Sequence, residues 1–532
     1  MQLYMPHPKA GPLSFADVCG GYSGLDGEET DRTLPRFCIS SIQMEQSEMA
    51  LEPKIGIEVH AQLSTDSKMF CSCSCEFGAE PNSNCCPVCL GMPGSLPVPN
   101  RKAIEYVIRT AAALNCTVAE HCRFARKNYF YPDLPKNFQI SQYDEPLSFD
   151  GHVDLTVNGD QVRIRIRRAH LEEDTGKNIH LPDGSSLVEY NRCGIPLMEI
   201  VTEPDFTSAE QCREYLVQLR ALLRYIGVSN ANMEEGAMRA EPTVNLADEE
   251  TGEGTPLVEI KNLNSIKSVY DAVEYEIERQ RRALEQGNTD ELFQQTRRWD
   301  EERGVTATMR TKETSEDYMY FPEPDLVPMA PDRAWVEEIK ASVPELPQAR
   351  RRRFVEEYDL PEYDAEILTE SREMADFFEA AAKAFNGSPK TVSNWAMGDF
   401  TSLLHETGVA VEDSPVGPEA LAELLSIAEE GTISGKIAKD VLPRMFETGK
   451  GAREIVAEEG LAQISDAGEL EAIVEQVVEE NPGPAEDFRG GKEKAIGFLI
   501  GQVMKATQGQ ANPQIVNEIM REKLGGTQQA PS

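Results

Sequence analysis

The stretch PKIGIEVHAQLS, residues 53–64, alternates apolar and polar side chains. Apolar side chains at every second position predict a β-strand that buries one face. Side chains two residues apart on a strand point to the same side, so Glu58 and His60 share the opposite face. A solvent-exposed face is the ordinary interpretation of such a pair. If the pair is buried, it needs a partner, because an unpaired buried charge is costly.

Strands and helices follow this stretch without a regular β-α-β rhythm. VDLTVNGDQVRIRIRRAHL (153–171) alternates as strands do, whereas SAEQCREYLVQLRALLRYIG (208–227) has apolar residues at helical spacing. We therefore expect an α+β fold in which a large antiparallel sheet domain precedes helices. We expect residues 1–50 to be an extension that is either disordered or the product of a wrongly assigned start codon. The expected domains are a sheet domain at 51–334, a helical linker at 335–412 and a small helical tail domain at 413–532.

Composition restricts the class of protein. The chain has 532 residues and a net charge of −39 from 52 basic and 91 acidic residues. It has neither a long apolar run nor a secretory leader, which predicts a cytoplasmic protein. The acidic residues are spread among hydrophobic ones, which favours a salt-adapted surface and a halophilic archaeal source. Such a charge argues against a nucleic-acid partner, but molar salt shortens the screening length to about 3 Å.

Six cysteines lie within FCSCSCEFGAEPNSNCCPVCLG, residues 70–91. Zinc binds four thiolates in a tetrahedron, and two closely spaced pairs joined by a loop supply that arrangement. CSC provides Cys71 and Cys73, and CPVC provides Cys86 and Cys89. A full set of four thiolates leaves no position for water, so we expect a structural zinc site. Free buried thiols are the alternative, and Cys75 and Cys85 compete for the ligand positions.

Further acidic groups occur in LEEDTGKN, LMEIVTEPD and NMEEGAMR. Oxygen ligands at several strand ends suit Mg²⁺, which also binds substrate phosphates. Basic, amide and hydroxyl side chains are candidate donors to the phosphates of a nucleotide; they are Arg239, Lys261, Asn262, Asn264 and Ser265. The chain has no P-loop motif, so a bound nucleotide needs a different cradle.

Ten ordered motifs between residues 54 and 525 together resemble one known family. They are IGIEVHAQLSTDSKMFC, FGAEPNSNCCPVCLGMPGSLPVPN, YFYPDLPKNFQISQYDEPL, HLEEDTGKN, EYNRCGIPLMEIVTEPD, NMEEGAMR, VEIKNLNS, EYEIERQ, DYMYFPEPDL and FLIGQVMKATQGQANP. The chain is similar to the B subunits of aspartyl/glutamyl-tRNA(Asn/Gln) amidotransferases, in their zinc-bearing branch.

The resemblance implies an ATP-dependent ligase that forms a carbon–nitrogen bond. The expected partners are an amidase-type A subunit, a small C subunit and a tRNA misacylated with Glu or Asp, with the 51–334 domain catalytic and the tail binding tRNA. The side-chain carboxylate would be phosphorylated and then amidated by ammonia channelled from glutamine.

The resemblance also implies roles for individual residues. The catalytic set is Glu58, His60, Glu172, Glu173, Lys127 and Lys136, of which the two lysines match channel positions. The Mg²⁺ ligands are Glu58, His60, Glu173 and Glu199, and the Zn²⁺ ligands are Cys71, Cys73, Cys86 and Cys89.

Two other functions are alternatives to the B subunit of a three-subunit amidotransferase. An archaeal paralogue acts on Glu-tRNA(Gln) alone, but it has an insertion before its helical tail, whereas this chain passes directly from FPEPDL into helices. A non-enzymatic, zinc-stabilised RNA-binding scaffold would have the cysteine cluster and the tail, but it would not need the Glu and His residues.

Overall fold

The computed structural model describes residues 51–525, except 249, 312–317, 465–466 and 508–509. The predicted extension at 1–50 lies outside the described residues. Within the described part of the chain, none of the helices has the length and apolar character that crossing a membrane requires.

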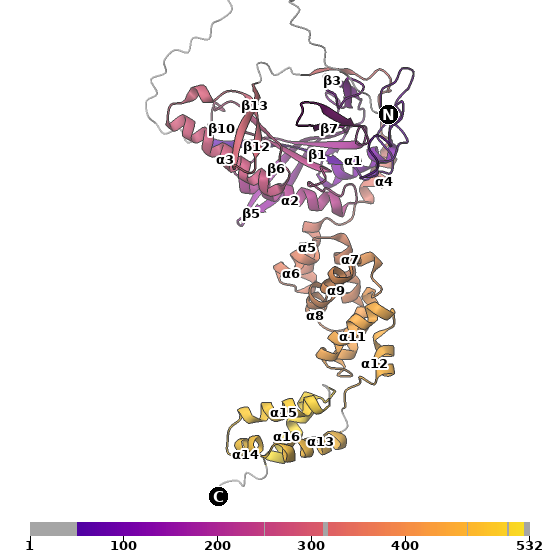
Figure 1. Cartoon of the computed structure of the whole chain (residues 1–532), viewed down its shortest axis with the longest axis vertical. Coiled ribbons are helices and arrows are strands. Elements are labelled where there is room, and N and C mark those ends of the chain that lie inside the picture. Colours follow the sequence, from indigo (N-terminus) through magenta and orange to yellow (C-terminus); the bar gives the residue numbers. More distant parts are fainter. Residues whose placement is uncertain (1–50, 249, 312–317, 465–466, 508–509, 526–532) are drawn as a thin grey trace, which may run out of the picture. The chain divides into compact units, whose positions relative to one another are not determined.

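A nine-stranded sheet organises the first part of the chain (Figure 1). Its strands are, in spatial order, β13 (Val305–Thr311), β12 (Gln295–Asp300), β11 (Val258–Lys261), β10 (Met238–Ala247), β1 (Glu52–Gln62), β9 (Pro196–Thr202), β6 (Asp160–Glu173), β5 (Ser148–Val157) and β2 (Thr117–Val118). β1 contains most of the alternating stretch at 53–64, and it lies at the centre of the sheet.

The α+β class is confirmed, but the sheet is mixed rather than purely antiparallel. β11 and β12 run parallel, whereas the other neighbouring strands pair antiparallel. The cause is α3 (Ile266–Glu285), which connects β11 to β12 as a crossover helix, and a crossover is the connection that parallel strands need.

Helices cover one face of this sheet. Its apolar side chains, which include Ile55, Ile57 and Val59 of β1, pack with helical residues in one core. The covering helices are α1 (Arg101–Ala113), α2 (Ala209–Tyr225) and α3, and each begins at a side-chain cap, Asn100, Ser208 or Ser265. The other face of β1 carries the polar residues of the alternation, including Glu58 and His60.

Two small sheets accompany the large one. The first consists of β14 (Met319–Pro322), β3 (Ala125–Asn128) and β4 (Phe138–Ser141), and the second of β7 (Lys177–His180) and β8 (Ser186–Glu189). β3 and β4 contribute side chains that contact Glu172 of β6, so the first small sheet lies over the polar face of the large one.

The rest of the described chain is helical. The elements are α4 (Arg333–Ala341), α5 (Pro347–Tyr358), α6 (Glu362–Leu368), α7 (Arg372–Ala384), α8 (Pro389–Trp395), α9 (Thr401–Thr407), α10 (Pro418–Glu429), α11 (Gly435–Thr448), α12 (Ala452–Glu459), α13 (Ala467–Glu480), α14 (Pro482–Arg489), α15 (Lys494–Ala506) and α16 (Pro513–Leu524). Short turns η1 (Thr289–Glu291), η2 (Ala396–Phe400) and η3 (Val411–Asp413) complete the set.

These helices enclose two further apolar clusters. One contains residues from Phe354 to Val456, and the other contains residues from Leu470 to Leu524. The first cluster includes residues on both sides of 412, where the sequence predicts a boundary. The predicted domain limits stay a prediction.

Candidate functional site

Side chains from three central strands form one row on the polar face of the large sheet. His60 of β1 lies opposite Glu199 of β9, and Glu199 lies opposite His170 of β6. Directly opposed residues point to the same side of a sheet, so the three polar groups converge. Glu172 lies two residues after His170 on β6 and joins them.

The distances within this group suit a shared cation. His60 Nε2 lies 3.4 Å from Glu199 Oε2 and 3.8 Å from Glu172 Oε2. His60, Glu172 and Glu199 each place one ligand atom within 4.8 Å of the others, and both carboxylates are buried. Two buried carboxylates and an imidazole are donors that a divalent cation takes, so these three residues fit a metal ion.

The small sheet supplies the other contacts of Glu172. Ser141 Oγ donates a hydrogen bond of 2.6 Å to Glu172 Oε1, and Gln139 Nε2 donates one of 3.0 Å to Oε2. Lys127 Nζ lies 3.9 Å from Glu172 Oε1. Lys127 and Gln139 are paired in the β3–β4 register, which places both side chains on the face that looks toward the large sheet.

Electrostatics keep the group charged. Burial alone would raise the pKa of Glu199, but His170 and His60 hold it well below its ordinary value. Burial likewise opposes ionisation of Glu172, yet Lys127 lowers its pKa. Burial would lower the pKa of Lys127, but Glu172 and Glu199 raise it. The site therefore combines buried anions with a half-buried cation, Lys127, at its border.

Glu58 lies next to this group rather than inside the three-atom set. It shares the face of His60 and lies opposite Glu241 of β10. Burial, followed by the nearby charge of Glu199, raises the pKa of Glu58. This accumulation of carboxylates would be relieved by a cation.

Glu173 lies outside the converging group of His60, Glu172 and Glu199. It is buried, accepts a hydrogen bond of 2.9 Å from the backbone N–H of Ile140, and forms an ion pair with Lys136. Glu173 and Lys136 line a cavity of about 230 Å³ with Lys68, Arg126 and Glu323. The structure thus brings His60 and Glu199 together with Glu172, and it groups Glu173 with Lys136.

The five predicted nucleotide-binding residues divide into two groups. Arg239 lies opposite His60 and forms a 3.0 Å ion pair with Asp174, while Lys261 pairs with Glu241 and lies 3.1 Å from Glu259. Both belong to the polar side of the sheet. The other three lie in the loop that connects β11 to α3. Asn262 has a positive φ of 66°, and its side chain donates a hydrogen bond to the backbone oxygen of Trp299. Asn264 is exposed, and Ser265 is the N-cap of α3.

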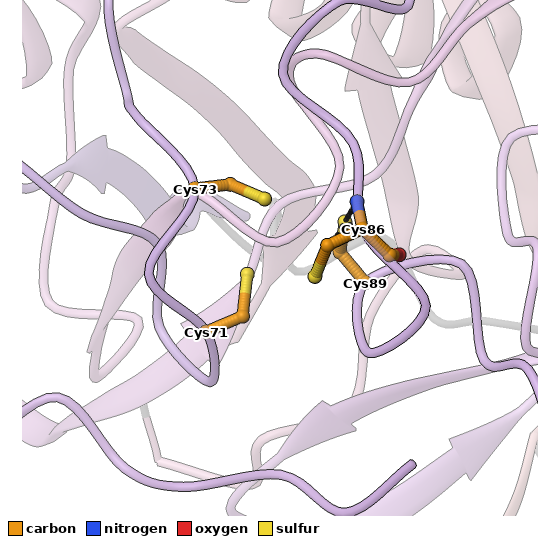
Figure 2. Close-up of side chains that lie close together, drawn as sticks. All are labelled: Cys71, Cys73, Cys86 and Cys89. Atoms are coloured by element: carbon orange, nitrogen blue, oxygen red, sulfur yellow. Dashed lines mark hydrogen bonds between the residues drawn. The ribbon is translucent and has the colours of Figure 1, made fainter.

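The four predicted zinc ligands converge (Figure 2). Their sulfur atoms lie within 4.8 Å of one another, and Cys86 Sγ and Cys89 Sγ are 3.9 Å apart. A zinc ion with Zn–S bonds of about 2.3 Å needs sulfur atoms about 3.8 Å apart, so the donor set fits tetrahedral zinc. Lys68 Nζ, which is buried, lies 3.9 Å from Cys89 Sγ and contributes positive charge.

The two additional cysteines have other neighbours. Cys75 Sγ lies 3.9 Å from Thr65 Oγ1, and Cys85 Sγ lies 4.0 Å from Asn191 Oδ1. Burial is the main cause that raises the pKa of each thiol. Neither belongs to the converging set of four.

Sequence reasoning missed several residues of the site. His170 is buried and lies 3.6 Å from Glu199, and its Nδ1 atom has no hydrogen-bond partner among the described residues. The signal was present in HLEED, because His170 and Glu172 have the same two-residue spacing as Glu58 and His60. Gln139 and Ser141 were missed because their hydrogen bonds to Glu172 form between two sheets.

The fold and the polar site define a class of protein. Residues 53–337 match the family model described as GatB/GatE catalytic domain, and residues 376–524 match the one described as GatB domain. The sheet, the converging carboxylates and the helical region all lie within or between these matches.

Relatives narrow the class to one family. The chain is 53% identical over 476 residues to the B subunit of an aspartyl/glutamyl-tRNA(Asn/Gln) amidotransferase from Caldanaerobacter subterraneus, and the match covers 90% of this chain and 100% of the relative. It is 53% identical over 479 residues to the B subunit from Moorella thermoacetica and 52% identical over 477 residues to that from Persephonella marina, with the same coverage. The chain belongs to the family of aspartyl/glutamyl-tRNA(Asn/Gln) amidotransferase B subunits. These relatives are bacterial, so the comparisons do not support the predicted halophilic archaeal source.

Proposed function

We propose that this chain is the subunit of a tRNA-dependent amidotransferase that activates and amidates the acyl group. The substrate is Glu-tRNA(Gln), Asp-tRNA(Asn) or both. ATP phosphorylates the side-chain carboxylate, and ammonia from glutamine then displaces the phosphate to give Gln-tRNA(Gln) or Asn-tRNA(Asn). The reaction class is that of an ATP-dependent ligase. Membership in the B-subunit family supports this proposal.

The observation that carries the proposal is the meeting of His60, Glu172 and Glu199 beneath Lys127. A carboxylate is a poor electrophile because its oxygen is a poor leaving group, and phosphorylation corrects this. Phosphoryl transfer demands positioning and neutralisation of negative charge more than covalent catalysis by the protein. A divalent ion held by the buried carboxylates, together with Lys127, would provide those conditions.

His60, Glu172 and Glu199 would hold the divalent ion, with Glu58 next to them. The ion, expected to be Mg²⁺, supplies positive charge to the phosphate oxygens. Ser141 and Gln139 fix the orientation of the Glu172 carboxylate through their hydrogen bonds. Lys127 contributes a second positive charge at the border of the site, where the substrate carboxylate and the transferred phosphoryl group would meet.

Ammonia would reach this site through the cavity that contains Lys136 and Glu173. Gln139 connects the two regions, because its Nε2 donates 3.0 Å to Glu172 Oε2 and 2.8 Å to the backbone oxygen of Glu173. The cavity and the cation site are thus separated by adjacent residues of β6. We assign Lys136 and Glu173 to the ammonia path and Lys127 to its end.

The nucleotide would lie along β10 and β11. Arg239 and Lys261 are the donors on the polar side of the sheet, and both are held by carboxylates that the nucleotide phosphates would replace or share. Asn262, Asn264 and Ser265 remain predicted contacts, close to the first turn of α3.

The assembly requires other chains. The relatives are B subunits, and such a subunit belongs to an enzyme of several chains. We propose an amidase-type A subunit and a small C subunit as the partners. We assign residues 51–334 to catalysis, 335–412 to a linker and 413–532 to tRNA binding. The four converging cysteines would hold a structural zinc ion.

The test is reconstitution with the A and C subunits from the same genome. With ATP, Mg²⁺ and glutamine, we expect Glu-tRNA(Gln), Asp-tRNA(Asn) or both to be converted to the amide. Conversion of Glu-tRNA(Gln) alone would favour the paralogous activity. Binding of tRNA without ATP turnover or amide formation would contradict the proposal and favour the RNA-binding scaffold.

A further inference from the structure

Four tyrosines line the side of the small sheet that faces the carboxylates. Tyr320 of β14 is paired in register with Lys127 of β3, and Tyr318 precedes Tyr320 by two residues. Tyr129 contacts Tyr318 edge to face, with ring centroids 5.3 Å apart. Tyr143 stacks on Tyr320 at 4.2 Å with an interplanar angle of 14°. The result is an aromatic wall along one border of the candidate site.

This wall is connected to the cation site by two basic residues. Arg168 donates to the backbone oxygen of Tyr143 at 3.5 Å, and its Nη2 lies 3.6 Å from Glu199 Oε1. Lys127 Nζ lies 5.1 Å from the ring centroid of Tyr318 and 3.9 Å from Glu172. The rings therefore border the place where the substrate carboxylate would react.

Tyr143 is the most exposed member of the wall and offers a ring face to a ligand. Tyr320 covers one face of its ring, yet Tyr143 is 50% exposed. Single exposed hydrophobic residues are normal on protein surfaces. Here the exposed ring extends an existing stack, and it stands beside a buried charge cluster rather than alone on a surface.

We propose that Tyr143 is the platform on which the 3′-terminal base of the acylated tRNA stacks. This inference rests on the proposed function. The reacting carboxylate is joined to that base by only one amino acid and one ribose, so the base must lie at the border of the site when the carboxylate reacts. Unpaired RNA bases stack on aromatic side chains.

The charge of the chain is consistent with this mode of binding. A net charge of −39 opposes the approach of RNA, so the reacting end needs a contact that does not depend on long-range attraction. Stacking on a neutral ring is such a contact, and it orients the terminal ribose at the same time. Arg168 and Lys127 supply positive charge only where the acyl group and the phosphates would meet.

The test uses the complete enzyme and an acylated tRNA whose 3′-terminal base is 2-aminopurine, a base whose fluorescence is quenched by stacking. We expect quenching with the wild type and with Tyr143→Phe, which keeps the ring. Tyr143→Leu should lose the quenching and raise the KM for acylated tRNA by about 5- to 100-fold. The KM for ATP and the release of ammonia from glutamine should stay near their wild-type values.

Phe77→Leu is the matched control, because Phe77 is 76% exposed on the loop between the two cysteine pairs and has no place in the wall. It should leave both the quenching and the KM unchanged. If Tyr143→Leu does not fold, Tyr143→Trp replaces it, and the larger ring should strengthen the quenching relative to Tyr143→Phe.

Equal quenching by wild type and Tyr143→Leu would overturn the inference, as would equal quenching by the Phe and Trp variants in the second experiment. Loss of subunit assembly in Tyr143→Leu, with tRNA affinity intact, would instead make the wall a protein interface and would also overturn it. Failure of the wild-type enzyme to form any amide would count against the proposed function itself.

Discussion

Glu172 and Glu173 are consecutive residues of β6, yet their carboxylates belong to different sites. Glu172 joins His60 and Glu199, whereas Glu173 pairs with Lys136 in the neighbouring cavity. Alternation along a strand explains the divergence, because successive side chains point to opposite sides. In the proposed function, Glu172 serves carboxylate activation and Glu173 serves ammonia delivery.

This separation predicts different defects for two matched variants. Glu172→Gln should reduce ATP turnover stimulated by misacylated tRNA by at least about 100-fold, because it removes a charged donor of the cation site. Glu173→Gln should abolish amide formation while leaving much of that ATP turnover, because it removes the carboxylate that pairs with Lys136 in the proposed ammonia path. Both should bind tRNA almost as well as the wild type. Phosphate release, amide formation and tRNA affinity, measured in parallel, check this. Equal loss of phosphate release in the two variants would refute the separation.

The cysteine cluster predicts one zinc ion per chain. Cys86→Ser and Cys89→Ser should each lose bound zinc and lower the melting temperature, because three thiolates leave the coordination incomplete. Cys75→Ser and Cys85→Ser are the controls, and they should retain zinc because their sulfur atoms lie elsewhere. Elemental analysis of the purified chain measures the outcome. Zinc retained by all four variants would contradict the assigned ligand set.

Lys261 provides a test of the nucleotide site. Lys261→Gln should raise the KM for ATP about tenfold or more, because a charge-assisted hydrogen bond contributes about 1.5–3 kcal/mol. Lys267→Gln is the control, since Lys267 is exposed on α3 and pairs with Asp271 four residues along the helix. Steady-state kinetics at saturating misacylated tRNA give both values. If the KM for ATP is unchanged in Lys261→Gln, Lys261 does not contact the nucleotide.

The helical region contains a carboxylate whose ionisation should stabilise the fold. Burial opposes ionisation of Glu379, but hydrogen bonds from Arg353, Lys383 and Arg350 lower its pKa from 4.5 to about 2. A folded-state pKa below the ordinary value means that the stabilisation is complete above about pH 5. It declines as the pH falls toward 2.

Glu379→Gln should therefore lower the melting temperature at pH 7, and its difference from the wild type should shrink between pH 5 and pH 3. Glu357→Gln is the control, because Glu357 is more exposed and, among the described residues, forms an ion pair only with Arg353. Thermal unfolding of the full chain across this pH range decides the matter. A difference that stays constant down to pH 3 would contradict the assigned cause.

The sequence by itself determined the features that depend on local periodicity and spacing. Alternation in residues 53–64 placed Glu58 and His60 on one face, helical spacing located α2, and two close cysteine pairs identified the four converging thiols. Each of these depends on residues near one another in the chain, where backbone geometry fixes the relative direction of side chains.

Only the tertiary structure decided which distant groups meet. The register of β9 against β1 and β6 put Glu199 between two histidines, and the small sheet brought Lys127, Gln139 and Ser141 onto Glu172. The β6–β9 register shifts between Ile166 and Arg168, and the residue pattern does not reveal such an irregularity. Alternation specifies the face of a side chain within its own strand. The pairing between strands depends on long-range packing, and that packing brought Glu172 of β6 to His60 and Glu199.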